Sequence, residues 1–266
     1  MSKASINTWI NGCTGRMGET LTRTIADSRS FALVGGTGYG FAGLWQKDQL
    51  QEVPESVALE QLPGARLAID FSTPEGNQNF LGQWRDAGGS LDGKAILIAT
   101  TGLSADQKKN WQEFSEKNGL RTLIAPNTSL GVLTTAQSCR AIARTLRGKH
   151  FDIEIIESHH RHKIDSPGGT AKFLAESIAS QEGLRPVYNR SGKREQDEIG
   201  VFAMRGGSVF GEHKVRFMGD FEEISVSHTA FSRHLFADGA LVLGRWLLKK
   251  PAGFYHLLDV DLAEIS

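Results

Sequence analysis

The sequence has little cysteine, no long apolar run and no net charge. Its cysteines, Cys13 and Cys139, are too few for a disulfide framework, so a reducing cytoplasm is the expected location. No run of about 18 apolar residues is present, and the N-terminal residues lead into a short strand-like segment instead of a signal-peptide core, so no membrane association is expected. Thirty basic and thirty acidic residues balance. That balance disfavours nucleic acid as a partner and favours small molecules or further copies of the chain.

The composition is that of a globular protein. Hydrophobic residues make up 39% and charged residues 23% of the 266 positions, which argues against disorder and allows one large domain or two modest ones. Thirty glycines are many for this length, and they cluster near 12–18, 35–43, 168–169 and 206–211. Such clusters indicate turns shaped around ligands.

Strands and helices alternate in the first half of the chain. The expected strands are 6–11, 31–34, 67–71, 95–99 and 122–125, and the expected helices include 19–27 and 105–118. Residues 35–40 are expected to form a glycine-rich loop after the second strand. This alternation predicts an α/β fold with a parallel sheet covered on both faces.

The pattern changes after Asn127. A helix over 132–147, a strand over 151–157 and a helix over 170–180 are followed by three strand candidates, which are 199–205, 208–218 and 222–230. Short turns between these strands predict antiparallel pairing. An amphipathic helix over 235–249 ends the chain. We therefore predict one domain from residues 1–127 with 234–266, and a second from 128–233.

A glycine turn follows the first strand and precedes the first helix. Gly12, Gly15 and Gly18 let backbone N–H groups approach a pyrophosphate at the positive end of the helix, and Arg16 stands where a guanidinium can clamp phosphate oxygens. The acid that usually follows the second strand and holds the ribose hydroxyls is missing, because 36–39 reads Gly-Thr-Gly-Tyr. The turn predicts a nicotinamide dinucleotide, with NADPH at least as good as NADH.

The densest chemistry lies in the His-rich stretch, residues 154–170. If 157–163 stays extended, His159, Arg161 and Lys163 share one face, and His160 and His162 share the other. An imidazole can deliver a proton, and an ammonium can hold a carboxylate. Residues 168–170, Gly-Gly-Thr, offer N–H groups and a hydroxyl at a helix start. The stretch predicts a site where a small dianion is protonated by His159 beside Lys163.

Two other interpretations of this stretch remain. His159, His160, His162 and Asp165 are possible metal ligands, although the interleaved cations repel a dication, and we expect no metal. The charges are also compatible with a solvated loop, an interpretation that the adjoining glycine turn disfavours.

These residues resemble the dihydrodipicolinate reductase family, also named 4-hydroxy-tetrahydrodipicolinate reductase. The resemblance covers almost the whole chain, and the motif in the His-rich stretch is far more specific than the glycine turn. The two main motifs are Gly12-x-x-Gly15-Arg16-Met17-Gly18 and Glu157-x-His159-His160-x-x-Lys163-x-Asp165-x-Pro167-x-Gly169-Thr170. Weaker matches are Asp70-Phe71-Ser72-x-Pro74-Glu75, Thr100-Thr101-Gly102, Asn127-x-Ser129-x-Gly131, Arg205-Gly206-Gly207, Gly211-Glu212-His213 and Ser232-Arg233.

The resemblance implies reduction of a cyclic imine dicarboxylate, 4-hydroxy-tetrahydrodipicolinate, to tetrahydrodipicolinate with NAD(P)H, in lysine and diaminopimelate biosynthesis. It implies that His159 is the acid/base residue and Lys163 its cationic partner, with the substrate carboxylates held by His160, Gly169, Thr170 and Arg233. It further implies a cofactor site formed by Gly12, Gly15, Arg16, Met17, Phe71, Ser72, Thr100, Thr101, Gly102, Pro126, Asn127 and Thr128. The implied architecture is a Rossmann domain completed by the C-terminal helix, with a mixed-sheet α+β domain through which homotetramers form.

The chain departs from the family pattern at two places. Gly168 stands where the family usually has Ser, which removes one hydroxyl contact to the substrate, and the ribose-binding acid is absent. These departures leave room for a non-catalytic or altered-specificity NADP-binding homologue. A metal hydrolase built on the histidines is the third hypothesis.

Overall fold

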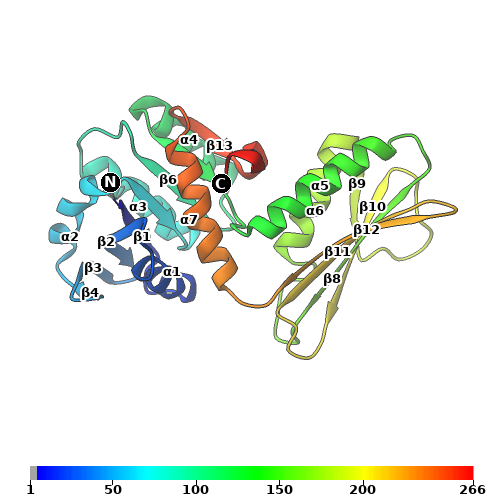
Figure 1. The fold of residues 1–266 in the computed structure, drawn as a ribbon, viewed down its shortest axis with the longest axis horizontal. Helices are drawn as coiled ribbons and strands as arrows, with labels where there is room; N and C mark the ends of the chain where they lie inside the picture. Colours follow the sequence, from blue (N-terminus) through cyan, green and yellow to red (C-terminus); the bar gives the residue numbers. More distant parts are fainter. Residues whose placement is uncertain (1–4, 266) are drawn as a thin grey trace. The chain divides into compact units, whose positions relative to one another are not determined.

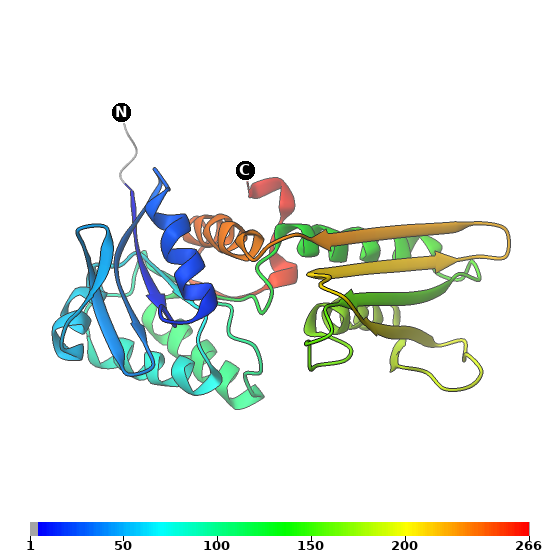
Figure 2. The same cartoon turned by 90° about the horizontal axis from the view of Figure 1, so that it is seen from below.

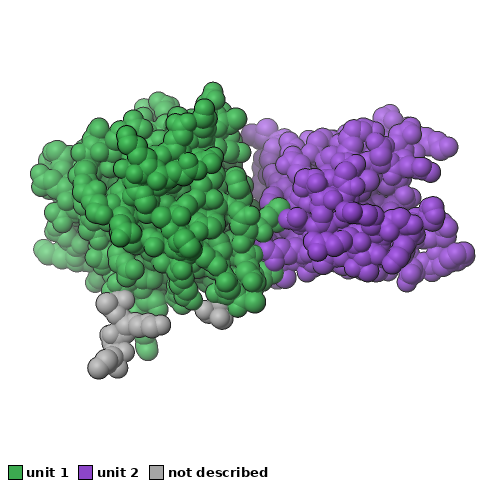
Figure 3. All heavy atoms as spheres, turned by 90° about the horizontal axis from the view of Figure 1, so that it is seen from above, with its two compact units in different colours: residues 1–129, 233–266 green, residues 130–232 purple. Residues whose placement is uncertain are grey.

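The computed structural model describes residues 5–265 and divides the chain into two compact units. Unit 1 comprises residues 1–129 and 233–266, and unit 2 comprises 130–232 (Figure 3). No helix in the described part of the chain is long and apolar enough to cross a membrane.

Unit 1 is built on an eight-stranded sheet, counted over the described residues, in the order β13-β7-β6-β5-β1-β2-β3-β4. Neighbours from β13 to β2 pair in parallel, and β3 and β4 extend one edge in antiparallel fashion. The strands are β1 (Ile6–Asn11), β2 (Phe31–Gly38), β3 (Phe41–Gln46), β4 (Gln49–Glu52), β5 (Leu67–Asp70), β6 (Ala95–Ile98), β7 (Arg121–Ile124) and β13 (Gly253–His256). The parallel order confirms the predicted α/β class.

Helices cover both faces of this sheet. The helices α1 (Arg16–Ala26) and α7 (His234–Leu248) pack together on one face, while α2 (Glu55–Gln61), α3 (Pro74–Asp86) and α4 (Ala105–Asn118) cover the other (Figures 1 and 2). The core under α3 and α4 contains Trp84, Trp111 and Phe80, with little or no exposed surface. Short 3-10 helices lie at Leu62–Gly64, Leu257–Asp259 and Leu262–Glu264.

The expected glycine-rich loop at 35–40 is wrong in its first part, because β2 continues to Gly38. A Cβ atom on Gly35 would lie 2.6 Å from the Trp9 ring, and one on Gly36 would lie 2.9 Å from Cys13 Cβ. Side chains of neighbouring residues occupy the space that a Cβ atom would need at these two positions, which explains why glycine stands inside the strand.

Unit 2 carries a five-stranded mixed sheet, again over the described residues, in the order β12-β11-β8-β10-β9. Helices α5 (Leu130–Leu146) and α6 (Gly169–Glu182) lie side by side over one face (Figure 1). The strands are β8 (Asp152–His159), β9 (Arg185–Tyr188), β10 (Glu198–Arg205), β11 (Gly211–Met218) and β12 (Glu223–Ala230).

The antiparallel prediction for unit 2 holds for only one of the two successive pairs. Strands β11 and β12 do pair antiparallel, but β10 and β11 are separated by β8, which pairs parallel with β10 and antiparallel with β11. The β8 strand, which enters the His-rich stretch, is therefore the central strand of this sheet.

Candidate active site

The glycine turn of unit 1 is tightly packed against backbone atoms of nearby residues in the same unit. Gly12 has φ +84°, and a Cβ atom there would lie 2.7 Å from the Phe71 carbonyl oxygen. A Cβ atom on Gly18 would lie 2.2 Å from the Gly12 carbonyl oxygen. The helix α1 begins at Arg16, and its N-cap residue Gly15 makes no side-chain cap. The turn thus offers backbone N–H groups and the positive end of a helix dipole without a side chain in the way, which fits a pyrophosphate.

A buried carboxylate organises the loops beside this turn. Asp70, at the end of β5, is fully buried and accepts hydrogen bonds from Asn11 Nδ2 (2.8 Å), Asn77 Nδ2 (2.7 Å), Ser72 N (3.1 Å), Ser72 Oγ (2.5 Å) and Thr100 Oγ1 (2.7 Å). Burial raises the pKa of Asp70 despite these hydrogen bonds. Asp70 thereby ties β1 to the loops that follow β5 and β6.

The predicted cofactor residues cluster at one edge of the unit 1 sheet. They follow the parallel strands β1, β5, β6 and β7, whose carboxyl ends meet at that edge. In the loop after β7 the side chain of Thr128 donates to the carbonyl of Phe236 in α7 (2.6 Å), and Asn127 Oδ1 accepts from the N–H of Ser129 (2.9 Å). Residues brought to this edge are Gly12, Gly15, Arg16, Met17, Phe71, Ser72, Thr100, Thr101, Gly102, Pro126, Asn127 and Thr128.

The end of β2, where a ribose-binding acid usually stands, is occupied by neutral residues. Thr37 is buried, and its hydroxyl donates to Asn11 Oδ1 (3.0 Å). A Cβ atom on Gly38 would lie 2.5 Å from Thr14 Oγ1, and Tyr39 beyond it is fully exposed. Residues 36–39 therefore offer no carboxylate that could bind the ribose of a nucleotide at the end of β2.

In unit 2, a buried ion cluster forms around Glu157 near the end of β8. Glu157 has no exposed surface, and its Oε1 accepts from Arg205 Nη2 (2.7 Å) and from the N–H of Gly168 (2.9 Å). Its Oε2 pairs with Nδ1 of His159. Burial alone would raise the pKa of Glu157, but Arg205, the Gly168 N–H and His159 outweigh it and hold that pKa below the ordinary value. These partners therefore favour the ionised form of Glu157, which pairs with the ring of His159.

The His159 ring is held from two sides. Its side chain is 12% exposed, and a Cβ atom on the neighbouring Gly211 would lie 3.0 Å from its Nε2. Burial lowers the pKa of His159, and the positive charges of Lys163 and Arg205 act in the same direction, against the opposing pull of Glu157. The imidazole is therefore poised to gain a proton when a further negative charge arrives.

The predicted alternation of side chains along 157–163 is wrong beyond His159. The strand ends there, and the chain turns, with the N–H of Lys163 bonded to the carbonyl of His160 (3.1 Å). The Ser166–Pro167 peptide bond in this segment is cis. Lys163 nevertheless returns to the start of α6, where its Cε lies 2.9 Å from the position of a Cβ on Gly168 and its Nζ donates to Asp165 Oδ1 (2.6 Å).

The other predicted substrate residues are divided between the units. Gly169 and Thr170 are the first residues of α6, whose N-cap Gly168 makes no side-chain cap. His160 follows directly on β8, half-buried, with its ring 6.2 Å from that of His162. Arg233 is the N-cap residue of α7 and belongs to unit 1. The structure therefore gathers His159, His160, Lys163, Gly169 and Thr170 in unit 2 without Arg233.

Sequence reasoning assigned no role to Glu157, Arg205 or His213. Strand register brings them together: Glu157 pairs with His213 across β8 and β11, and His159 pairs with Arg205 across β8 and β10. Potential ligand atoms of Glu157, His159 and His213 lie within 4.8 Å of one another. The available signals were the short matches around Arg205 and His213, which carried no information on pairing.

The metal interpretation named the wrong ligands. The group of potential metal ligands in the described residues contains His159 but not His160, His162 or Asp165. Glu157 is the only carboxylate in this group, and Arg205 already binds it. The positive charge of Arg205 disfavours a divalent metal ion at the same carboxylate.

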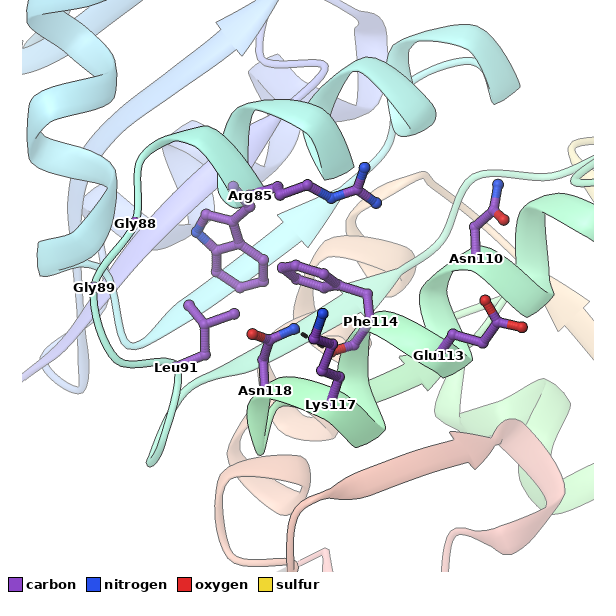
Figure 4. A pocket seen from close by; sticks show the side chains of 10 residues that line it. Arg85, Gly88, Gly89, Leu91, Asn110, Glu113, Phe114, Lys117 and Asn118 are labelled. Atoms are coloured by element: carbon purple, nitrogen blue, oxygen red, sulfur yellow. Dashed lines mark hydrogen bonds between the residues drawn. The ribbon is translucent and has the colours of Figure 1, made fainter.

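A pocket of about 500 Å³ lies away from all of these residues, between α3 and α4 of unit 1 (Figure 4). The guanidinium of Arg85 lies over the Phe114 ring, 5.9 Å from its centroid, and Asn118 Nδ2 donates to the Phe114 carbonyl (2.7 Å). The lining residues are Trp84, Arg85, Gly88, Gly89, Leu91, Asn110, Glu113, Phe114, Lys117 and Asn118. None of the predicted site residues lines this pocket.

Comparison with known proteins follows the two units. Residues 6–128 match the family model described as dihydrodipicolinate reductase, N-terminus, and residues 131–260 match dihydrodipicolinate reductase, C-terminus. The 4-hydroxy-tetrahydrodipicolinate reductase of Methanopyrus kandleri is 36% identical over 94% of both chains. That of Aquifex aeolicus is 36% identical over 96% of this chain and 98% of its own.

Solved structures show the same fold. A dipicolinate-bound dihydrodipicolinate reductase from Paenisporosarcina sp. TG-14 superposes with a TM-score of 0.75 at 20% identity, covering 97% of this chain and 100% of that one. A diaminopimelate dehydrogenase from C. glutamicum follows with a TM-score of 0.60 at 12% identity, covering 100% of this chain and 96% of that one. Because both family models match in order and together span most of the sequence, the chain belongs to the dihydrodipicolinate reductase family, a family of oxidoreductases that use a pyridine nucleotide.

Proposed function

We propose that this chain reduces 4-hydroxy-tetrahydrodipicolinate to tetrahydrodipicolinate with a nicotinamide nucleotide and a proton, the 4-hydroxyl group leaving as water, in lysine and diaminopimelate biosynthesis. The observation that carries the proposal is the buried Glu157–His159 pair beside Lys163 at the start of α6. The relatives named above, and the dipicolinate bound by the Paenisporosarcina enzyme, support a cyclic dicarboxylate as the substrate.

Unit 1 holds the nucleotide in this proposal. The turn at Gly12, Gly15 and Arg16 binds the pyrophosphate, and Met17 lies in the first turn of α1. The loops kept in place by Asp70, together with the loop after β7, line the remainder of the nucleotide; they contribute Phe71, Ser72, Thr100, Thr101, Gly102, Pro126, Asn127 and Thr128. When bound, the nucleotide supplies the hydride.

NADPH is proposed to bind at least as well as NADH. A carboxylate at the end of β2 would repel a 2′-phosphate, and 36–39 contains none. The hydroxyl of Thr37 is committed to Asn11, so it does not take the carboxylate's place on the ribose. Neither cofactor is therefore rejected by charge at this position.

Unit 2 holds the substrate and moves the proton. Gly169 and Thr170 at the start of α6, with His160, bind carboxylate oxygens, and Lys163 adds a positive charge; Arg233 of unit 1 is the further carboxylate ligand carried over from the family pattern. A dianion placed here raises the pKa of His159, so substrate binding itself favours the protonated imidazole. Glu157 then stabilises the imidazolium until its proton passes to the substrate carbon.

The first test is steady-state oxidation of NADPH with freshly generated substrate. His159→Ala and Lys163→Ala are each expected to lower kcat/KM by about 10²- to 10⁴-fold, the usual contribution of a positioned proton donor and its charge partner. Calorimetry should show unchanged nucleotide binding, because both residues lie in unit 2. Full activity in either variant would sink its assigned role.

The second test concerns the cofactor. Titration of the wild-type protein with NADPH and NADH is expected to give an affinity for NADPH equal to or above that for NADH. A strong preference for NADH contradicts this proposal without touching the reaction assigned above. Tight NADPH binding with no turnover of any cyclic imine would instead favour a non-catalytic homologue, which none of the comparisons supports.

We further propose a homotetramer located in the cytoplasm. The tetramer rests on the family pattern, and the location on two buried free thiols, Cys13 and Cys139. Light scattering of the purified protein would give the mass of the assembly.

A further inference from the structure

A row of histidines runs across the unit 2 sheet from the proposed site. His213 on β11 lies opposite Glu157 of β8 on one side and opposite His228 of β12 on the other. The ring of His213 is 5.3 Å from that of His159, at 73°, and 6.4 Å from that of His228. Exposure follows the row: His213 is 4% exposed and His228 is half-buried.

The buried ring of His213 destabilises the folded state. Both of its ring nitrogens are buried, and neither has a hydrogen-bond partner among the described residues. A buried polar atom without a hydrogen-bond partner destabilises the fold, whereas a phenylalanine ring of similar size has no polar atom to satisfy. The nitrogens of His213 therefore serve something other than packing.

The environment of His213 suits proton transfer. Burial lowers its pKa to about 4, helped by the charges of His159 and His228 against the pull of Glu157, so the ring is neutral near pH 7 with one donor and one acceptor nitrogen. Ligand atoms of His213, His159 and Glu157 lie within 4.8 Å of one another, a separation that one water molecule bridges. His228 continues the row with a buried, unpartnered Nδ1.

We propose that His213 is a positioning residue that acts through His159 and, with His228, returns a proton to it in each catalytic cycle. This proposal rests on the function proposed above. An N–H bond of His213 breaks as one forms on His159, and the other nitrogen of His213 accepts a proton arriving by way of His228. Each relay ring stays neutral but ends in its other tautomer, so a ring flip or proton exchange must restore the first tautomer before the next cycle; the net result is one solvent proton on His159.

The test separates the ring of His213 from its nitrogens. His213→Phe keeps a ring beside His159 without nitrogens, and His213→Ala leaves space that free imidazole can fill. Both variants are expected to lose about 100-fold in kcat with an unchanged KM for NADPH. Added imidazole should restore most of the lost kcat in His213→Ala and little of it in His213→Phe. His150→Asn, which removes an exposed histidine of the same unit, is the matched control and should behave as wild type.

Wild-type kcat in His213→Phe would overturn the proposal, because the nitrogens would then have no task. Loss in His213→Ala that imidazole leaves unchanged would also overturn it, since a structural defect is not repaired by a proton donor. Because wild type is assayed alongside, failure of this proposal is distinct from failure of the reaction: an inactive wild type refutes the proposed function, and an active one with insensitive His213 variants refutes only the relay. If His213→Ala fails to fold, the kcat of His213→Phe decides alone.

Discussion

Two buried carboxylates, one in each unit, occupy similar places and behave in opposite ways. Asp70 ends the parallel strand β5, and Glu157 lies near the end of β8; neither has any exposed surface. Asp70 is held by amide, hydroxyl and backbone donors alone, and burial raises its pKa. Glu157 is held by Arg205 and His159 as well as by a backbone N–H, and its pKa is lowered. The charge of the partners decides the direction.

The difference separates a structural node from a chemical one. Neutral donors around Asp70 join three segments of chain, which holds in place the loops that we propose for the nucleotide. Cationic partners around Glu157 keep it ionised and hold one imidazole in a fixed orientation. A buried carboxylate whose partners include a titratable ring is thus the better indicator of proton chemistry.

Loss of the Glu157 charge should have the largest effect. In Glu157→Gln the side chain keeps its shape, but the imidazolium of His159 loses its counter-charge and Arg205 is left with a neutral partner. We expect kcat/KM to fall by about 10²- to 10⁴-fold, with nucleotide affinity unchanged by calorimetry. Glu154→Gln is the matched control, because Glu154 is a buried carboxylate of the same strand paired with Arg190. Equal losses in the two variants would show that Glu157 is merely structural.

Asp70→Asn should affect stability more than the proton step. One carboxylate oxygen becomes an NH₂ group that faces the donors of neighbouring residues, so buried hydrogen bonds are lost. We expect the free energy of unfolding to fall by about 2–3 kcal/mol, measured in denaturant. NADPH affinity should weaken as the loops at Ser72 and Thr100 relax, whereas the effect of His159→Ala on kcat should persist in the variant background. An unchanged free energy of unfolding in Asp70→Asn would show that Asp70 does not stabilise these loops.

The two carboxylates should also give opposite pH dependences of stability. The folded-state pKa of Asp70 is raised, so its contribution is present below the ordinary aspartate pKa and is lost as pH rises through the folded value. The folded-state pKa of Glu157 is lowered, so its contribution is present above the ordinary glutamate pKa and is lost as pH falls through the folded value. Denaturant unfolding of wild type, Asp70→Asn and Glu157→Gln over a pH series tests this. As pH rises, the free energy of unfolding of wild type minus that of Asp70→Asn should decrease, and the same difference for Glu157→Gln should increase. A change of the same sign in both differences would contradict this prediction.

Gly168→Ser should have the smallest effect. The new Cβ would lie 2.9 Å from Lys163 Cε, at the flexible end of that side chain, so Lys163 moves away from Asp165 at little cost. We expect unfolding free energy within about 0.5 kcal/mol of wild type. The KM for the dicarboxylate should fall by a few-fold, about 1 kcal/mol, as the serine hydroxyl adds a contact. Gly82→Ser in α3, where a Cβ also meets nothing within 4 Å and no proposed site residue stands, is the control for the added side chain itself.

Local signals predicted local structure well. The helix expected over 105–118 is α4, because Ser104 and Gln107 form a capping box at its start and Gly119 takes a left-handed conformation at its end. The glycine turn could also be predicted, because its three glycines are spaced along a short segment between a strand and a helix. Pairing between strands is not a local property, so the antiparallel pairing expected between the strands at 199–205 and 208–218 was wrong, and β3, β4, β9 and β13 were not predicted.

The sequence by itself determined the fold class and the family, because spacing and glycine placement are written along the chain, and it singled out the stretch for which we propose the chemistry. The roles given to His159 and Lys163 stay predictions until the variants are assayed. Only the tertiary structure decided the surroundings of His159: strand register sets Glu157, Arg205 and His213 around it from three strands. These partners, against the effect of burial, hold the pKa of Glu157 below its ordinary value, while burial lowers the pKa of His213 and keeps its ring neutral.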